Sequence, residues 1–267
     1  QAGVDVSQIK MWDDLLDAVK QIKAAGITPI CMGGKDKWPV HFVWTHLHIR
    51  NGGKGLFLES LNNGGWDRPE YIRSGEQMLE LVELEPFQKG WLAATWPDQA
   101  GFFGDGKCAM AFMGNWMYGA QASNSASGEG LGDSNMGMFN MPMTNGGLGD
   151  SGDTLGGING WLFSSSASDA AVELMMHYIS LDIQKEDASN GAYIPIVKGA
   201  DGSLTNPFLQ QVAKNISSSE YHQIFYDQFL GADIGRVVND VSTDLAAGII
   251  SAEEATQAVQ EAWEFNQ

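Results

Sequence analysis

Near the start of the chain, the spacing of apolar residues changes from that of a helix to that of a buried strand. Within residues 12–22, apolar side chains recur at every third or fourth position, and aspartates and lysine lie between them. This spacing predicts an amphipathic helix, and Gly26 predicts its end. The apolar residues 27–32 then predict a short strand, which Pro29 restricts to a sheet edge or a strand start.

Helices and short strands continue to alternate along the rest of the chain. Local signals mark the start of three further helices: Pro69 in the first turn of a helix from near Asp67, Ser168 as the cap of a helix over residues 168–181, and a capping box that begins at Ser251. We expect two more helices, over residues 221–230 and 234–245. We expect strands over residues 107–113, 136–139 and 161–163. Helices that alternate with strands predict an α/β architecture.

The composition restricts the possible partners. The 267 residues include 33 acidic and 15 basic side chains, which gives a formal net charge of −18. Such a surface repels phosphates, so neither nucleic acid nor an anionic membrane surface is expected as a partner. The hydrophobic fraction of 43% indicates a folded globular chain. No apolar run approaches the roughly 18 residues that a membrane span needs.

Few residues mark a metal or catalytic site. His46 and His48 form an H-x-H pair, but no third ligand is near them and the segment looks helical, so we expect neither a metal nor a cofactor. The two cysteines, Cys31 and Cys108, have apolar flanks, and free cysteine packs well as a small hydrophobe. We therefore expect free thiols, with a single disulfide as the alternative. Carboxylates are plentiful, so a glycosidase-type pair stays open as a rival interpretation.

Tryptophans recur where predicted strands pass into loops: Trp38, Trp116 and Trp161. A sugar ring has flat C–H faces and a belt of hydroxyl groups, so its recognition favours an aromatic ring for the face and Asn, Asp or Arg for the belt. One tryptophan alone is better explained as a core residue. Their repetition beside glycines and amides predicts a sugar pocket. The polar contacts that we expect in it come from Asn115, Asn159 and Arg236.

Several stretches, in this order, resemble extracellular solute-binding proteins of ABC sugar importers, the family that includes maltose-binding protein. The matching stretches are W-D-D-L-L at residues 12–16, A-A-G-I-T-P-I at 24–30, G-K-C-A-M at 106–110, M-G-N-W at 113–116 and S-A-E-E-A at 251–255. The resemblance implies a two-lobed α/β fold of the type II periplasmic-binding-protein class, with sugar held in a cleft between the lobes. It also implies a non-enzymatic receptor that delivers a mono- or oligosaccharide to ABC permease subunits.

The resemblance further implies the domain organisation. Residues 1–158 and 216–267 would form the C-terminal lobe, and residues 159–215 would belong to the N-terminal lobe, with hinge crossings. Family members have a long segment before the helix at residues 12–22 that builds most of the first lobe. Because this chain starts at Gln1 without a signal peptide, we expect a processed or truncated N-terminus. We also expect that a separate fragment of the N-terminal lobe stays bound to this chain. Without that fragment, an apolar patch would be exposed, formed by Leu174, Met175, Tyr178, Ile179 and Ile194.

The family's ligand contacts carry over to several positions. Trp116 matches the family's aromatic platform, and Trp38 falls where a cleft aromatic is found. Asn159 stands where some glucose-binding members have an aspartate. The further positions are Tyr193, Asp227 and Arg236. The implied location is the periplasm, or the cell exterior through a lipid anchor. The rivals are a secreted carbohydrate-active hydrolase and a lobe that acts as an interaction domain.

Overall fold

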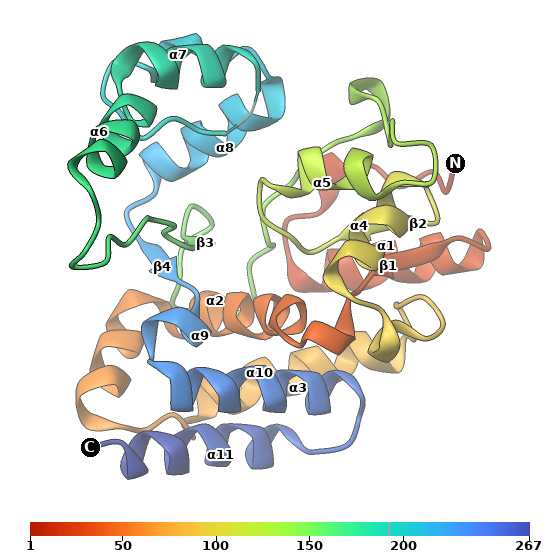
Figure 1. The fold of residues 1–267 in the computed structure, drawn as a ribbon. Coiled ribbons are helices and arrows are strands. Elements are labelled where there is room, and N and C mark those ends of the chain that lie inside the picture. Colours follow the sequence, from red (N-terminus) through yellow and green to blue (C-terminus); the bar gives the residue numbers. More distant parts are fainter. Residues whose placement is uncertain (192) are drawn as a thin grey trace. The chain divides into compact units, whose positions relative to one another are not determined.

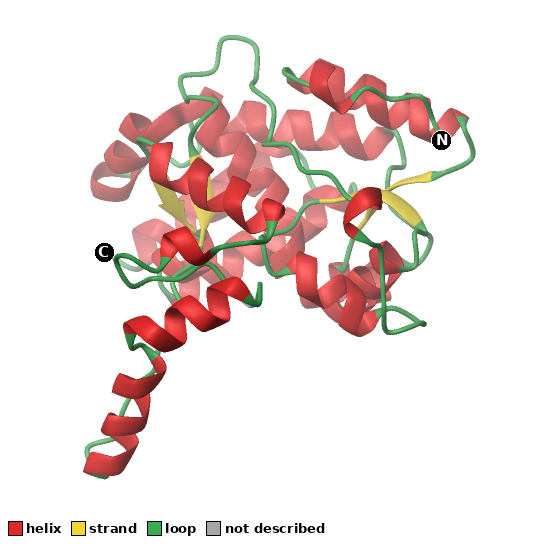
Figure 2. Cartoon of the chain, turned by 90° about the horizontal axis from the view of Figure 1, so that it is seen from above, coloured by secondary structure: helices red, strands yellow, loops and turns green. Residues whose placement is uncertain are grey.

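The computed structural model describes residues 1–191 and 193–267, most of them in helices (Figure 1, Figure 2). The chain divides into two compact units. The first unit contains residues Gln1–Gly156 and Glu220–Gln267, and the second contains Gly157–Ser219. Each unit has its own packing and is described by itself.

Helices form most of the first unit, and its four strands are short. Its elements are α1 (Trp12–Ala24), β1 (Thr28–Cys31), α2 (Trp38–Asn63), α3 (Pro69–Glu83), α4 (Trp96–Gly104), β2 (Cys108–Ala111), α5 (Met117–Asn124), β3 (Thr154–Gly156), β4 (His222–Ile224), α9 (Tyr226–Phe229), α10 (Ala232–Ala246) and α11 (Ala252–Phe265). The strands form two separate parallel pairs, β1 with β2 and β3 with β4. In the second pair, Thr154 lies opposite His222. Two-stranded pairs this short are marginal alone, so helix packing must supply most of the stability.

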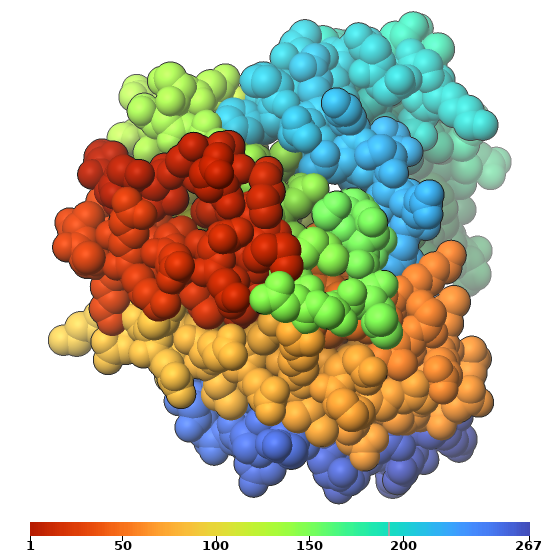
Figure 3. Space-filling model, turned by 180° about the vertical axis from the view of Figure 1, so that it is seen from behind, coloured from red at the N-terminus to blue at the C-terminus, as the bar shows by residue number. Residues whose placement is uncertain are grey.

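The core of the first unit is built from segments that lie far apart in the sequence. Helices α2 and α3 pack against α10 and α11 from the other end of the chain (Figure 1), and Figure 3 shows the orange and blue segments in contact from behind. The aromatic rings at the centre stack on one another: His48 lies 4.3 Å from Tyr71, and Tyr71 lies 5.6 Å from Trp66, between ring centroids. Burial lowers the pKa of His48 to about 3, so this imidazole is neutral inside the core.

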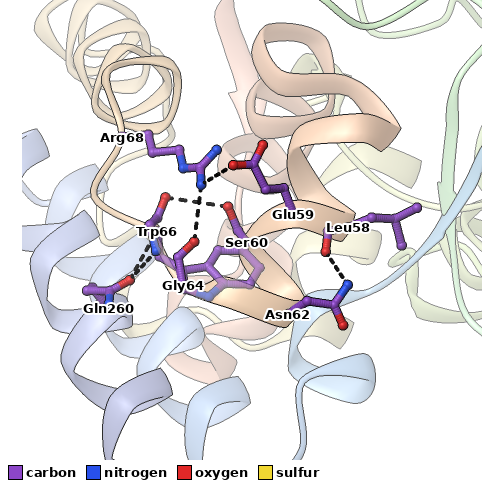
Figure 4. A network of polar contacts seen from close by, with 9 residues as sticks. Leu58, Glu59, Ser60, Asn62, Gly64, Trp66, Arg68 and Gln260 are labelled. Carbon is purple, nitrogen blue, oxygen red and sulfur yellow. Dashed lines mark hydrogen bonds and ion pairs between the residues drawn. The ribbon is translucent and has the colours of Figure 1, made fainter.

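Polar contacts fasten the turn between α2 and α3 to α11 (Figure 4). The side-chain oxygen of Gln260 accepts hydrogen bonds from the backbone N–H groups of Gly65 and Trp66, at 2.7 and 2.9 Å. Arg68 forms an ion pair with Glu59 at 2.8 Å across the same turn. One glutamine therefore satisfies two backbone donors that the turn leaves without helical partners.

A kink in α2 anchors the irregular segment between residues 141 and 153. Gly53 has φ of +61°, and a Cβ there would come within 2.9 Å of the Leu148 carbonyl oxygen. The backbone N–H groups of Leu148 and Gly149 donate to carbonyls of α2 just before the kink. The buried Arg50 guanidinium donates to the carbonyls of Met141, Asp150 and Asp153. The segment is thus ordered by backbone carbonyls converging on one arginine.

The second unit is smaller and has little core. It contains α6 (Asp169–Tyr178), α7 (Leu181–Ser189) and α8 (Pro207–Ser218). Its apolar cluster consists of the buried Ala188, Leu204 and Leu209, with Ile194 and Ala213 packed against them, and Ala200 is buried as well. Of the residues expected to form an exposed patch, Leu174 is 65% exposed, and Met175, Tyr178, Ile179 and Ile194 are half-buried. Leu162 and Ile196 are more exposed than any of these, at 101% and 76%.

The expected helices are confirmed where a capping residue, a proline or a clear helical spacing marked them in the sequence. The helix at residues 12–22 is confirmed as α1, Pro69 is the first residue of α3, and Ser168 caps α6. The Ser251 side chain accepts from the Glu254 backbone N–H, as the capping box predicts. Capping residues and proline act on the backbone next to them, so the helix starts that they mark can be predicted without knowledge of the rest of the fold.

Elements that depend on distant partners were predicted wrongly. Residues 136–139 and 161–163 are loop, and the strand of that region is β3 instead. The helix expected at 221–230 is α9 alone, because β4 pairs with β3 and is therefore extended. The segment around His46 and His48 is helical as expected and belongs to α2, but the bounds of this helix were not predicted, because most of its length is buried on every side and lacks a polar face.

The expectation of free thiols is wrong, because Cys31 and Cys108 form a disulfide. Strands β1 and β2 pair directly, and the two Cα atoms lie 5.5 Å apart, inside the range that a disulfide requires. Cys31 is fully buried and Cys108 is 4% exposed. The apolar flanks that favoured free thiols suit a buried disulfide equally well, so they could not decide between the two.

Candidate functional site

Five aromatic side chains of the first unit gather at one place, which we call the aromatic cluster: Trp38, Phe42, Trp96, Trp116 and Phe225. They come from four parts of the chain. Trp38 and Phe42 lie one turn apart at the start of α2, Trp96 begins α4, Trp116 directly precedes α5, and Phe225 lies between β4 and α9.

The cluster has a buried floor and a partly exposed rim. Phe42 and Phe225 are 5% and 6% exposed and stack with centroids 4.3 Å apart and planes 12° apart. The Trp38 ring lies 5.6 Å from that of Trp96 and 6.5 Å from that of Trp116, with tilts of 58° and 53°. Trp116 is 37% exposed, and Trp38 and Trp96 are half-buried. Two indole rings, those of Trp38 and Trp116, therefore border an apolar base, and the Trp96 ring lies beside that of Trp38.

Short-range contacts hold Trp38 and Trp96 next to each other. The Trp96 backbone N–H donates to the Asp36 carboxylate at 2.6 Å, which fixes the start of α4 to the turn before Trp38. The Gly33 backbone N–H donates to the buried Gln99 side chain at 2.9 Å. Thr95 caps α4 in a capping box with Asp98. The positions of these two tryptophans are therefore set by backbone contacts as well as by ring packing.

Trp116 folds back over a glycine. A Cβ on Gly114 would lie 2.2 Å from the Trp116 ring, so only glycine leaves room for the ring at this place. The carbonyl of Gly114 accepts from the Met117 backbone N–H at 3.0 Å and so begins the turn that leads into α5. The sequence Gly114-Asn115-Trp116 thus explains why the Trp116 ring lies against the backbone of the turn and stays partly exposed.

A polar network lies behind the floor of the cluster. His41 is fully buried, and its Nε2 lies 3.7 Å from a carboxylate oxygen of Asp227, whose other oxygen accepts from Asn239 at 3.2 Å. Burial lowers the pKa of His41 to about 4 and outweighs the opposing effect of Asp227. The imidazole is therefore neutral at pH 7. Asp227, a predicted ligand residue, is directed at His41 and Asn239.

Charged side chains at the start of α2 and on α10 form a group of ion pairs around one carboxylate, that of Asp240. Lys37 lies 2.6 Å and Arg236 lies 3.0 Å from opposite oxygens of Asp240. Arg236, predicted as a ligand residue, is thus an exposed residue of α10 within an ion pair. Asn115, next to Trp116, is half-buried, and its carbonyl accepts from the Tyr118 backbone N–H at 3.2 Å.

The remaining predicted ligand residues belong to the second unit. Asn159 is exposed in the loop before α6. The Tyr193 hydroxyl donates to Asp187 at 2.5 Å and accepts from the Gln184 amide at 2.6 Å. Burial and the adjacent Asp187 carboxylate raise the pKa of Tyr193. The structure therefore brings Trp38 and Trp116 together with Trp96, Phe42 and Phe225, which the sequence reasoning missed.

The histidine pair does not form a metal site. His46 Nδ1 lies 3.0 Å from the Phe42 carbonyl oxygen, and His48 stacks on Tyr71, so the two rings have different neighbours. Among the residues that the structure describes, no three His, Cys, Asp or Glu side chains gather as metal ligands would. Of the helices in the described part of the chain, none has both the length and the apolar character needed to cross a bilayer.

Residues 1–186 match the family of bacterial extracellular solute-binding proteins, and the chain belongs to this family. Two similar curated relatives are uncharacterized ABC transporter extracellular-binding proteins of Pyrococcus horikoshii. One is 29% identical over 118 residues, or 44% of this chain and 26% of the relative. The other is 30% identical over 115 residues, or 41% of this chain and 26% of the relative. The chain therefore spans about a quarter of these relatives.

Solved structures with the same type II binding-protein fold resemble nearly the whole chain. A chitin oligosaccharide binding protein matches with a TM-score of 0.85 and 26% identity, over 99% of this chain and 66% of the other. A protein solved in work on xylan utilization by Caldanaerobius polysaccharolyticus matches with a TM-score of 0.82 and 23% identity, over 97% and 67%. RafE in complex with raffinose matches with a TM-score of 0.67 and 18% identity, over 98% and 67%. The expected fold class is confirmed.

We predict that Gly114→Ala moves the Trp116 ring, because the added Cβ would overlap the ring where it now lies. The measurement is ¹⁹F NMR of protein labelled with fluorotryptophan, with the Trp116 signal assigned from Trp116→Phe. Gly119→Ala is the matched control, because a Cβ there meets nothing within 4 Å. A Trp116 signal that stays unchanged in Gly114→Ala would place the ring elsewhere.

Proposed function

We propose that the aromatic cluster binds the rings of a neutral mono- or oligosaccharide, and that the protein is a non-enzymatic sugar receptor of an ABC importer. The observation that carries the proposal is the arrangement of three partly exposed tryptophans, Trp38, Trp96 and Trp116, two of which contact a buried phenylalanine pair: Trp38 and Trp116. Indole faces pack against the C–H faces of sugar rings, and the differing tilts suit more than one ring.

Charge supports a neutral ligand. The chain carries a formal net charge of −18, which disfavours anionic sugars. Two cations near the cluster, Lys37 and Arg236, are paired with Asp240, which makes them less available to bind a carboxylate. The similar chitin oligosaccharide binding protein and RafE, solved with raffinose, give independent support for an oligosaccharide.

We also propose that the first unit is the C-terminal lobe of the receptor and the second unit is part of its N-terminal lobe. Polar contacts to the sugar would then come from Asn115, Asn159 and Tyr193. Asp227 and Arg236, which the sequence also suggested, are instead engaged by His41 and Asn239 and by Asp240. Sugar binding would favour a closed arrangement of the lobes, and permease subunits would recognise that arrangement. The receptor would act in the periplasm or, through a lipid anchor, outside the cell.

We predict that Trp116→Ala weakens binding of the preferred sugar by about 1–3 kcal/mol, or roughly 5–150-fold, because the sugar loses an aromatic contact. The stability should change little, since the side chain is 37% exposed. Calorimetric titration after a thermal-shift screen of mono- and oligosaccharides gives the affinity. Trp263→Ala in α11 is the control and should leave the affinity for the sugar unchanged.

Two results would oppose the proposal. Trp116→Ala with a much lower melting temperature and an unchanged affinity would assign Trp116 to the core. Release of free sugar from an oligosaccharide incubated with the wild-type protein would favour a hydrolase.

The second unit carries apolar side chains that nothing within it covers: Trp161, Leu162, Leu174, Met176 and Ile196 are 56%, 101%, 65%, 62% and 76% exposed. Soluble monomers avoid such surface. The chain matches 66–67% of the similar solved structures, so a further third of their length has no counterpart here. We propose that polypeptide of the N-terminal lobe covers this face.

We predict that the protein purified from its source carries additional polypeptide of roughly 10–15 kDa, the size expected of a missing lobe portion. Native and denaturing mass spectrometry together measure it, whether it is fused to the chain or associated with it. A monomer of 28.9 kDa would contradict this proposal. A dimer of that species would assign the face to a second copy instead.

A further inference from the structure

We propose that the Cys31–Cys108 disulfide positions Trp38 and Trp116 for sugar binding, so that its loss weakens binding in a protein that remains folded. The inference rests on the proposed function of the aromatic cluster. It assigns the disulfide a role in the site in addition to its contribution to stability.

The disulfide joins the two strands from which the two tryptophans follow. Strands β1 and β2 are four residues each and form a sheet of their own, so few hydrogen bonds fix one strand against the other. They are parallel, which places their carboxyl ends at the same edge. Beyond that edge, β1 leads to Trp38 and β2 leads to Trp116. The disulfide is the covalent link between the two branches.

The connection from β1 to Trp38 is firmly held. The Gln88 amide donates to the Met32 carbonyl at 2.6 Å and accepts from the Met32 backbone N–H at 2.9 Å, as a neighbouring strand would. Gly33 is bound to Gln99, and Gly34 packs against the Trp91 ring. A displacement of β1 would therefore be passed on to the start of α2.

The connection from β2 to Trp116 is short and tightly packed. Met110 and Phe112 pack against the main core, and the Trp116 ring lies against Gly114. The Trp38 and Trp116 rings are 6.5 Å apart, so a small shift of β2 relative to β1 changes the spacing and tilt of two surfaces that would contact the same sugar. Aromatic contacts depend steeply on such geometry.

The experiment compares wild type with Cys31→Ala/Cys108→Ala at a temperature at which both are fully folded. Alanine suits the buried, apolar surroundings of both positions. We expect the Kd for the best sugar found in the screen to rise at least five-fold. In sugar-free protein, the ¹⁹F signals of Trp38 and Trp116 should shift, and that of Trp263 should not.

A matched control separates positioning from stability. Val259→Ala removes two buried methyl groups from α11, a helix that packs on α3 and α10, and should lower the melting temperature without changing the Kd. If Cys31→Ala/Cys108→Ala does not fold, Cys31→Val/Cys108→Ala fills more of the vacated volume and is measured in its place.

An unchanged Kd together with unchanged Trp38 and Trp116 signals in the cysteine variant would overturn the positioning role. An equal rise of Kd in Val259→Ala would overturn it as well, because general destabilisation would then explain the loss. Failure of the wild-type protein to bind any sugar would instead refute the proposed function, so the two failures are distinguishable.

Discussion

Burial of α2 is the constraint on which both the core and the candidate site depend. From Pro39 to Gly53, nearly every side chain of this helix is buried, including His41, His48 and Arg50. Polar groups inside the protein must be neutral or hydrogen-bonded. Burial keeps the two histidines uncharged, and Arg50 is satisfied by the carbonyls that order residues 141–153. The start of the same helix presents Trp38 and Phe42 to the aromatic cluster, so the rigidity of the core extends to the site.

The aromatic cluster combines contributions that differ in role. Phe42 and Phe225 are buried and hold the floor together, whereas Trp38, Trp96 and Trp116 are partly exposed. Backbone contacts, the disulfide and one glycine fix the rim. Preorganised aromatic faces lose little conformational entropy on binding, which favours recognition of a ligand whose own contacts are weak and numerous. Two cations near the rim, Lys37 and Arg236, are engaged by Asp240.

The sequence predicted those features whose causes are local. Trp38 and Trp116 could be predicted as ligand-binding residues because each follows a glycine-containing turn after a strand. The starts of α6 and α11 could be predicted because each depends on a single capping side chain. Phe42 and Phe225 could not be predicted as members of the site, because the sequence around an aromatic residue on a buried helix or beside a short strand looks the same as that around any core residue. The pairing of β3 with β4 and the bond between Cys31 and Cys108 depend on contacts between distant segments, which no local pattern reveals.

If the aromatic cluster binds sugar, sugar rings lie on the tryptophan rings of the first unit. A crystal structure of the protein with its preferred oligosaccharide would show where the sugar binds. We expect sugar C–H faces in van der Waals contact, about 4 Å between carbon atoms, with the rings of Trp38 and Trp116. A well-ordered sugar bound elsewhere, with both indole faces uncovered, would contradict it.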